Sequence, residues 1–175
     1  SVSNKKEKLY NVIFPIWMLW IFPLTWLVIL PANFVIDLLA VAITMKVLKI
    51  EHIWATAKPV ILKVWLFGFL SDLIGTAAML MAAFLDEDIL GPTAGKWWYQ
   101  NISYSVNYNP FQSIYGFLWV TLCVVLAAAM IYLFNLKFSF KKAPLTDRQK
   151  RQLSLSLAVF TAPYLFYLPT MWFVR

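Results

Sequence analysis

The 175-residue sequence contains few of the side chains from which most enzymes and metal sites are built. It has one cysteine, Cys123, and one histidine, His52. A single cysteine excludes an intramolecular disulfide and any CxxC redox or metal motif. HExxH, GxSxG and P-loop motifs are also absent from the sequence. We therefore expect neither an enzyme nor a bound cofactor, and the sequence leaves the presence of a metal undecided.

Charged residues are equally scarce, at 13% of the chain against 62% hydrophobic residues. Water-soluble domains average about 25% charged and about 45–50% apolar residues, so this composition argues against an ordinary soluble domain. Aromatic residues reach 18%, including nine tryptophans, whose rings suit the headgroup layers of a bilayer. The net charge of +7 fits basic loops that attract anionic lipid. Membrane lipid, and no nucleic acid, is the expected partner.

Long apolar runs predict an all-α polytopic membrane protein. Five transmembrane helices are expected, at about residues 12–30, 33–49, 60–85, 111–136 and 153–174. The first two come from one apolar run, which as a single helix would be about 55 Å long against about 30 Å of hydrocarbon. Pro31 and Asn33 near its middle predict a tight hairpin. A re-entrant hairpin that does not reach the far face is the alternative.

Basic residues predict the orientation, because lysine and arginine concentrate in cytoplasmic loops. They lie before the first span (Lys5, Lys6, Lys8), around the turn between the second and third (Lys46, Lys49, Lys58, Lys63), and in residues 137–151. We expect these regions and the N-terminus to be cytoplasmic, and the aromatic loop 86–110 to be external. The whole chain, 1–175, is then one transmembrane domain. A bacterial cytoplasmic membrane is the expected location.

Two aspartates lie inside apolar spans, where a charge is costly. On a helix, Asp72 shares one face with Gly68, Gly75 and Met79, and Ser71 lies beside that face. Small residues along a face allow a neighbouring helix to approach closely. The second span carries a similar stripe, made of Asn33, Asp37, Ala40 and Thr44. Two polar stripes on consecutive helices predict that the two aspartates face each other.

Depth in the membrane supports this match. At about 1.5 Å per residue, Asp37 and Asp72 both lie about 18 Å from the cytoplasmic ends of their helices. The same measure places Asn33 level with Thr76, and Tyr164 of the last span near the aspartates. Two close carboxylates favour either a shared proton or a bound cation.

The sequence therefore predicts an ion or proton site made by Asp37, Asp72, Asn33 and Thr76. Ser71, Gly68, Gly75 and Tyr164 are expected to line the adjoining cavity. In the alternative interpretation, each aspartate only caps a broken helix or bonds a hydroxyl group, and so fixes helix packing. Interhelical polar contacts of that kind are common in membranes, although each contributes only about 0.6 kcal/mol on average.

The segment 94–116 mixes aromatic side chains with asparagine, glutamine and serine. It contains Trp97, Trp98, Tyr99, Tyr104 and Tyr108. Such a mixture can stack on a ligand and hydrogen-bond its edges, so these five residues are candidates for an external lid. An aromatic belt in the membrane interface is the alternative.

Together these patterns predict a small membrane transport protein: an ion- or proton-coupled transporter, a channel or a substrate-binding subunit. A small cation or another small molecule would be its substrate. The alternative is a membrane scaffold or accessory subunit whose polar stripes serve helix packing. Five spans are few for a complete transporter, so both interpretations predict a homo-oligomer or a membrane partner subunit.

Overall fold

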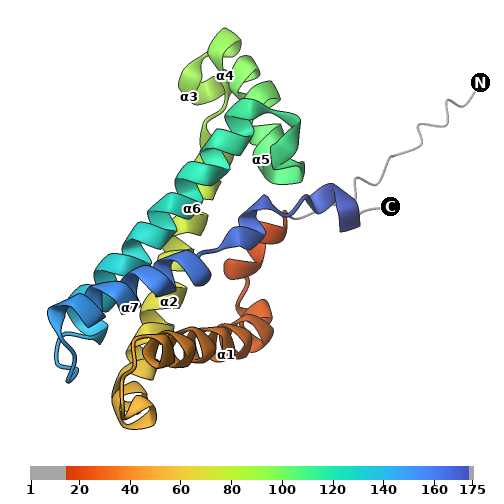
Figure 1. Ribbon diagram of the computed structural model, residues 1–175. Helices are drawn as coiled ribbons and strands as arrows, with labels where there is room; N and C mark the ends of the chain where they lie inside the picture. The colour runs from red at the N-terminus through yellow and green to blue at the C-terminus, as the bar shows by residue number, and fades with distance from the viewer. Residues whose placement is uncertain (1–14, 174–175) are drawn as a thin grey trace, which may run out of the picture.

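The structure, a computed structural model, describes residues 15–173, and this part of the chain is helical with no strand (Figure 1). Three of its helices are long and apolar enough to cross a membrane. They are α1 (Pro23–Val47), α2 (Ile53–Phe84) and α6 (Ile114–Phe134), the last of which continues as the π-helix η4 (Asn135–Ser139). The prediction of an all-α chain with membrane-length helices is confirmed.

Helices α2 and α6 pack side by side and form the long axis of the molecule (Figure 1). Helix α7 (Asp147–Phe160) packs along the half of α6 nearer to the start of α2, and α1 contacts both α2 and α7. Two groups of buried apolar side chains result. One lies around Val41, Val64, Ile131 and Leu157 near the start of α2, and the other around Trp20, Met79 and Val124 farther along it.

The segment predicted as an external loop, 86–110, is a series of short helices at one end of the α2–α6 pair (Figure 1). They are α3 (Glu87–Leu90), α4 (Pro92–Trp98), η2 (Tyr99–Ser103), α5 (Tyr104–Tyr108) and η3 (Pro110–Gln112). The indole of Trp98 donates to Ala82 O at 2.9 Å, and the hydroxyl of Ser103 donates to the same carbonyl at 2.5 Å. Ala82 lies in the last turn of α2, where carbonyls lack helical partners. The short helices are therefore attached to the end of α2 by hydrogen bonds to a carbonyl that has no partner within the helix.

The predicted hairpin at residues 31–33 is wrong, because α1 is one continuous helix that contains Pro31. A proline inside a helix removes one backbone donor and crowds the carbonyl four residues earlier. Membrane helices tolerate this where neighbouring groups bond the disturbed backbone. Next to the proline, the indole Nε1 of Trp65 in α2 donates to Leu30 O at 2.8 Å and so ties this part of α1 to α2. Residues 23–30 of the first predicted span and residues 33–47 of the second therefore belong to one helix.

Helix α1 is followed by a residue with left-handed backbone, which turns the chain into α2. Lys49 has a φ of 56°. The N–H of Ile50 donates to Met45 O at 3.0 Å, and the N–H of Lys49 donates to Lys46 O at 3.1 Å. This is the Schellman arrangement, which satisfies carbonyls at a helix end.

Basic side chains from separate segments meet at this end of the molecule. Lys49 and His52 line one shallow pocket together with Gln149. Lys63 lines another with Lys141 and Lys142. The two basic segments that were predicted to share one side of the membrane thus lie at one end of the α2–α6 pair.

The last predicted span, 153–174, does not form one membrane-length helix. Helix α7 has 14 residues, against the about 20 that a spanning helix needs. Pro163 and Pro169 cannot donate backbone hydrogen bonds, and the chain continues as the short 3-10 helices η5 (Tyr164–Tyr167) and η6 (Thr170–Phe173).

The other end of the described chain is broken in a similar way. The 3-10 helix η1 (Ile16–Trp20) precedes α1, which begins at a proline. The N–H of Ile16 donates to Thr170 Oγ1 at 3.1 Å, so the two broken segments contact each other. The lysines expected to mark a cytoplasmic N-terminus (Lys5, Lys6, Lys8), residues 12–14 of the first predicted span and Val174 lie outside the described residues.

The predicted glycine face of α2 is used for packing within this chain. A Cβ placed on Gly75 would lie 3.0 Å from Ala127 Cβ and 3.1 Å from Phe166 Cε2. Gly75 therefore lets α2 approach both α6 and η5 closely.

We predict that Gly75→Ala destabilises the protein by about 1–3 kcal/mol, because the added methyl group overpacks this contact. Unfolding in mixed detergent micelles, followed by tryptophan fluorescence, measures the effect. Ala77→Val is the matched control, since Ala77 is exposed on the same helix and tolerates added volume. Equal stability of the Gly75 variant and the control would contradict the close approach.

Candidate functional site

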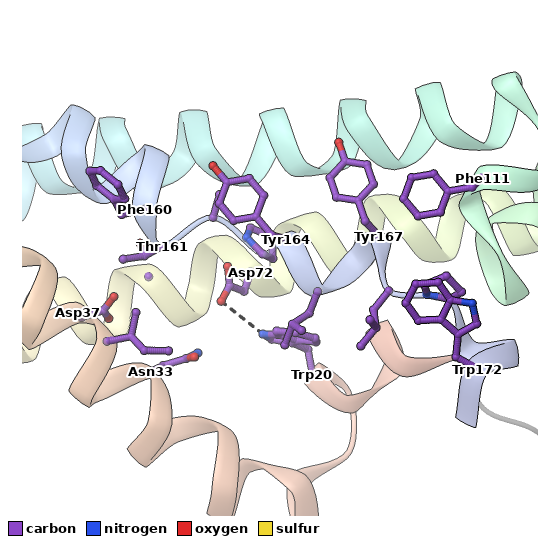
Figure 2. A pocket seen from close by; sticks show the side chains of 17 residues that line it. Trp20, Asn33, Asp37, Asp72, Phe111, Phe160, Thr161, Tyr164, Tyr167 and Trp172 are labelled. Carbon is purple, nitrogen blue, oxygen red and sulfur yellow. Dashed lines mark hydrogen bonds between the residues drawn. The ribbon is translucent and has the colours of Figure 1, made fainter. Parts of the chain in front are cut away.

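A cavity of about 480 Å³ lies between α1, α2 and the chain that follows α7 (Figure 2). Its wall is largely apolar and includes residues from η1 and from η5 and η6, the broken segments at the two ends of the described chain. The lining residues are Trp20, Asn33, Ile36, Asp37, Gly68, Asp72, Phe111, Phe160, Thr161, Ala162, Pro163, Tyr164, Leu165, Tyr167, Leu168, Pro169 and Trp172. Both aspartates singled out from the sequence therefore face one cavity.

Asp72 is supplied by the middle of α2 and is buried, with 5% of its surface exposed. The indole Nε1 of Trp20 donates to Asp72 Oδ2 at 3.3 Å (Figure 2). The other oxygen, Oδ1, is buried and has no hydrogen-bond partner among residues 15–173. A buried carboxylate oxygen without a partner carries a large desolvation cost.

Asp37 comes from α1 and is buried to the same degree, with 4% of its surface exposed. It lies over Gly68, where a Cβ would be 3.3 Å from Asp37 Oδ2. The small residue at position 68 thus makes room for the carboxylate. No lysine, arginine or histidine of the described chain lines the cavity. The two acids are therefore brought to one site without a basic partner on its wall.

The other predicted site residues divide into two groups. Asn33 and Tyr164 line the cavity with the aspartates. Ser71 and Thr76 do not line it; their hydroxyls donate within α2, to Phe67 O at 2.7 Å and to Asp72 O at 2.9 Å. Gly75 packs against α6 and η5 instead of the cavity.

The polar stripe of α1 divides between two neighbours. Asp37 faces Gly68 of α2, whereas the hydroxyl of Thr44 lies 2.6 Å from that of Ser156 in α7. From the sequence we expected the whole stripe to face α2, because nothing in the sequence indicated that α7 lies beside α1.

Aromatic rings form much of the cavity wall. The hydroxyls of Tyr164 and Tyr167 point away from the carboxylates (Figure 2). That of Tyr164 donates to Val159 O, and that of Tyr167 donates to Thr121 Oγ1 at 2.8 Å. The two tyrosines therefore present rings, not hydroxyl groups, to the cavity.

Several lining residues were not predicted from the sequence, notably Trp20, Phe111, Thr161 and Trp172. Three of these four lie in or beside the broken terminal segments. The prolines of these segments were the sequence feature that could have pointed to these residues, because a break in a helix at membrane depth is tolerated where it lines a cavity.

None of the five candidate lid residues lines the cavity. They contact other aromatic rings: Trp97 packs on Tyr115, Trp98 on Trp119, and Tyr104 on both Tyr99 and Tyr108. From segment 94–116, Phe111 alone reaches the cavity wall. His52 lies at the basic end, away from the cavity.

Groups of three or more histidine, cysteine, aspartate or glutamate side chains that could hold a metal ion do not occur within residues 15–173. Comparisons of the chain with models of protein families, with characterised proteins and with solved structures found no match. The chemistry of the cavity therefore rests on its own geometry.

We predict that Trp20 and Asp72 are energetically coupled through their hydrogen bond. Trp20→Phe keeps an aromatic ring against Phe166 but removes the indole donor, so it should destabilise the protein by the bond's about 0.6–1.7 kcal/mol in addition to some lost packing. In the Asp72→Ala background the same substitution should cost less by about the value of the bond, because only the loss of packing then remains. Unfolding of the four proteins in mixed micelles measures this double-mutant cycle.

Trp172→Phe in the same cycle is the control, because Trp172 lines the cavity without a hydrogen bond to Asp72. Additivity of the Trp20 and Asp72 substitutions within about 0.3–0.5 kcal/mol would show that the bond contributes nothing.

Proposed function

We propose that this protein is a small integral membrane transport protein that binds a cation or a proton at Asp37 and Asp72. The observation that carries the proposal is the pair of buried carboxylates facing one cavity whose described wall holds no basic side chain. Ionisable residues within membrane segments are costly and commonly mark ion pathways or proton relays. No catalytic activity is proposed.

The ligand would neutralise the two carboxylates. Asp72 Oδ1 is the atom most in need of it, because this oxygen is buried without a partner. Asn33, on the cavity wall, offers an amide oxygen next to the carboxylates. With no cation bound, a proton shared by the two aspartates would lower the cost of their burial.

We further propose that the lysine-rich end of the molecule faces the cytoplasm, in accordance with the positive-inside rule, and that the short helices α3 to α5 lie outside. A bacterial cytoplasmic membrane fits this arrangement. Three helices would cross the membrane, while the broken terminal segments would line the cavity between them.

The test is flux of H⁺, Na⁺ or K⁺ into liposomes that contain the purified protein. We expect Asp37→Asn and Asp72→Asn each to lower the flux at least about tenfold, because each removes one of two carboxylates that act together. The double variant should do little more, since coupled residues are non-additive.

Asp88→Asn is the matched control, because Asp88 is an exposed aspartate in α3, away from the cavity. Its flux should equal that of the parent protein. Undiminished flux in the Asp37 and Asp72 variants, combined with additive losses of stability, would defeat the proposal.

An accessory subunit is the second candidate function, and the exposure of α1 favours it. Only 11% of its most apolar 18-residue stretch is buried within the chain. Leu24, Leu27 and Val28 are more than two-thirds exposed, at 79%, 74% and 73%. The glycine face of α2 is already filled within the chain, so α1 is the helix that would take a partner.

If α1 is an assembly surface, the protein should migrate as an oligomer in mild detergent. Replacing Leu24 and Val28 with alanine should shift it toward the monomer on size exclusion with light scattering. Met81→Ala, an exposed position on α2, is the control. A monomer that retains flux would instead indicate that α1 faces lipid.

A further inference from the structure

The cavity offers few side-chain oxygen atoms to an inorganic cation. Apart from the tryptophans and tyrosines, its polar side chains are the two aspartates, Asn33 and Thr161, and the Thr161 hydroxyl donates to Leu157 O at 2.7 Å. The two tyrosine hydroxyls on the wall point away from the carboxylates (Figure 2). A hard ion such as Ca²⁺ takes six to eight oxygen ligands, so these side chains would fill its shell only if both carboxylates bound through two oxygens and Asn33 and Thr161 also took part.

The same wall is well suited to an organic cation. Six aromatic side chains line it: Trp20, Phe111, Phe160, Tyr164, Tyr167 and Trp172. A quaternary or protonated amine is attracted to the faces of such rings, most strongly to tryptophan. The volume of about 480 Å³ falls within the range of about 300–1,000 Å³ found for small-molecule sites.

The two carboxylates lie toward one side of the cavity, whereas aromatic rings extend across it. Figure 2 shows Asp37 and Asp72 toward one side, Phe111 and Trp172 toward the other, and Trp20 between them. This arrangement matches a molecule with a cationic head and an apolar tail. The partner-free Asp72 Oδ1 lies at the end expected to hold the head.

We infer that the cavity binds an organic ammonium ion, with its nitrogen beside Asp37 and Asp72 and its apolar part against Trp20 and Trp172. This inference rests on the proposed function, of which it names the substrate class. Tyr164 and Trp172 on the cavity wall are 51% and 68% exposed, and the membrane-length helices α1 and α2 contribute to the same wall. An amphiphilic amine dissolved in the bilayer could therefore enter from the lipid.

The test uses benzyltrimethylammonium and its uncharged carbon analogue, neopentylbenzene, which has the same shape. Isothermal titration calorimetry with the full chain in nanodiscs measures both. We expect saturable binding of benzyltrimethylammonium at one site per chain, and binding of neopentylbenzene at least about tenfold weaker, because only the charged compound is attracted to the carboxylates.

Variants separate the contributions to binding. Asp37→Asn or Asp72→Asn should weaken benzyltrimethylammonium binding at least about tenfold, and Asp88→Asn should leave it unchanged. Trp172→Leu should weaken it roughly 2- to 13-fold, the loss expected for one contact of about 0.5–1.5 kcal/mol between the indole and the benzyl ring. Thermal unfolding of each variant confirms that it is folded.

The outcomes distinguish this inference from the proposed function. Equal binding of the two compounds, or binding that survives the double Asp variant, would show apolar partitioning and overturn the inference. Asp-dependent flux of H⁺, Na⁺ or K⁺ without binding of benzyltrimethylammonium would also overturn it, while leaving the proposed function intact. Asp-dependent binding without any flux would support the organic-cation site and count against transport.

Discussion

Two carboxylates buried without a basic partner on the wall of their cavity are the constraint around which the centre of this protein is organised. Asp37 and Asp72 are each about 95% buried, and only one hydrogen bond, from the Trp20 indole, reaches either carboxylate from the described chain. Burying an unpaired charge costs several kcal/mol, so such groups persist where a proton or a cation neutralises them. The packing around the site is consistent with this need: Gly68 makes room for Asp37, and η1 brings an indole to Asp72.

The cavity exists because helices are interrupted on two of its sides. Helix α7 ends at Phe160, and the chain continues past Pro163 and Pro169 as 3-10 turns. On the other side η1 is separated from α1 by a short break before Pro23. Breaks in helices within a membrane are tolerated where they line a cavity, and aromatic residues of the interrupted segments line this one. The wall is consequently both acidic and aromatic.

Some site residues could be predicted because their positions follow from helical periodicity alone. Asp72 and Gly68 lie on one face of α2 by spacing, and depth placed Asp37 near Asp72. Both expectations agree with a shared cavity. Thr76 lies on the same stripe of α2, but its hydroxyl bonds Asp72 O within the helix. A helical stripe is wide enough to face two neighbours, so periodicity could not decide which of its members reach the cavity.

The sequence by itself determined that the chain is helical and apolar enough to cross a membrane, because composition and run length set these properties locally. It also determined that acidic side chains would lie inside apolar helices. Only the tertiary structure decided that α1 continues through Pro31 and is tied to α2 there by Trp65, 35 positions from Leu30. The same holds for Trp20 beside Asp72, 52 positions apart. Contacts between such distant residues depend on how whole helices pack, and no local pattern records that packing.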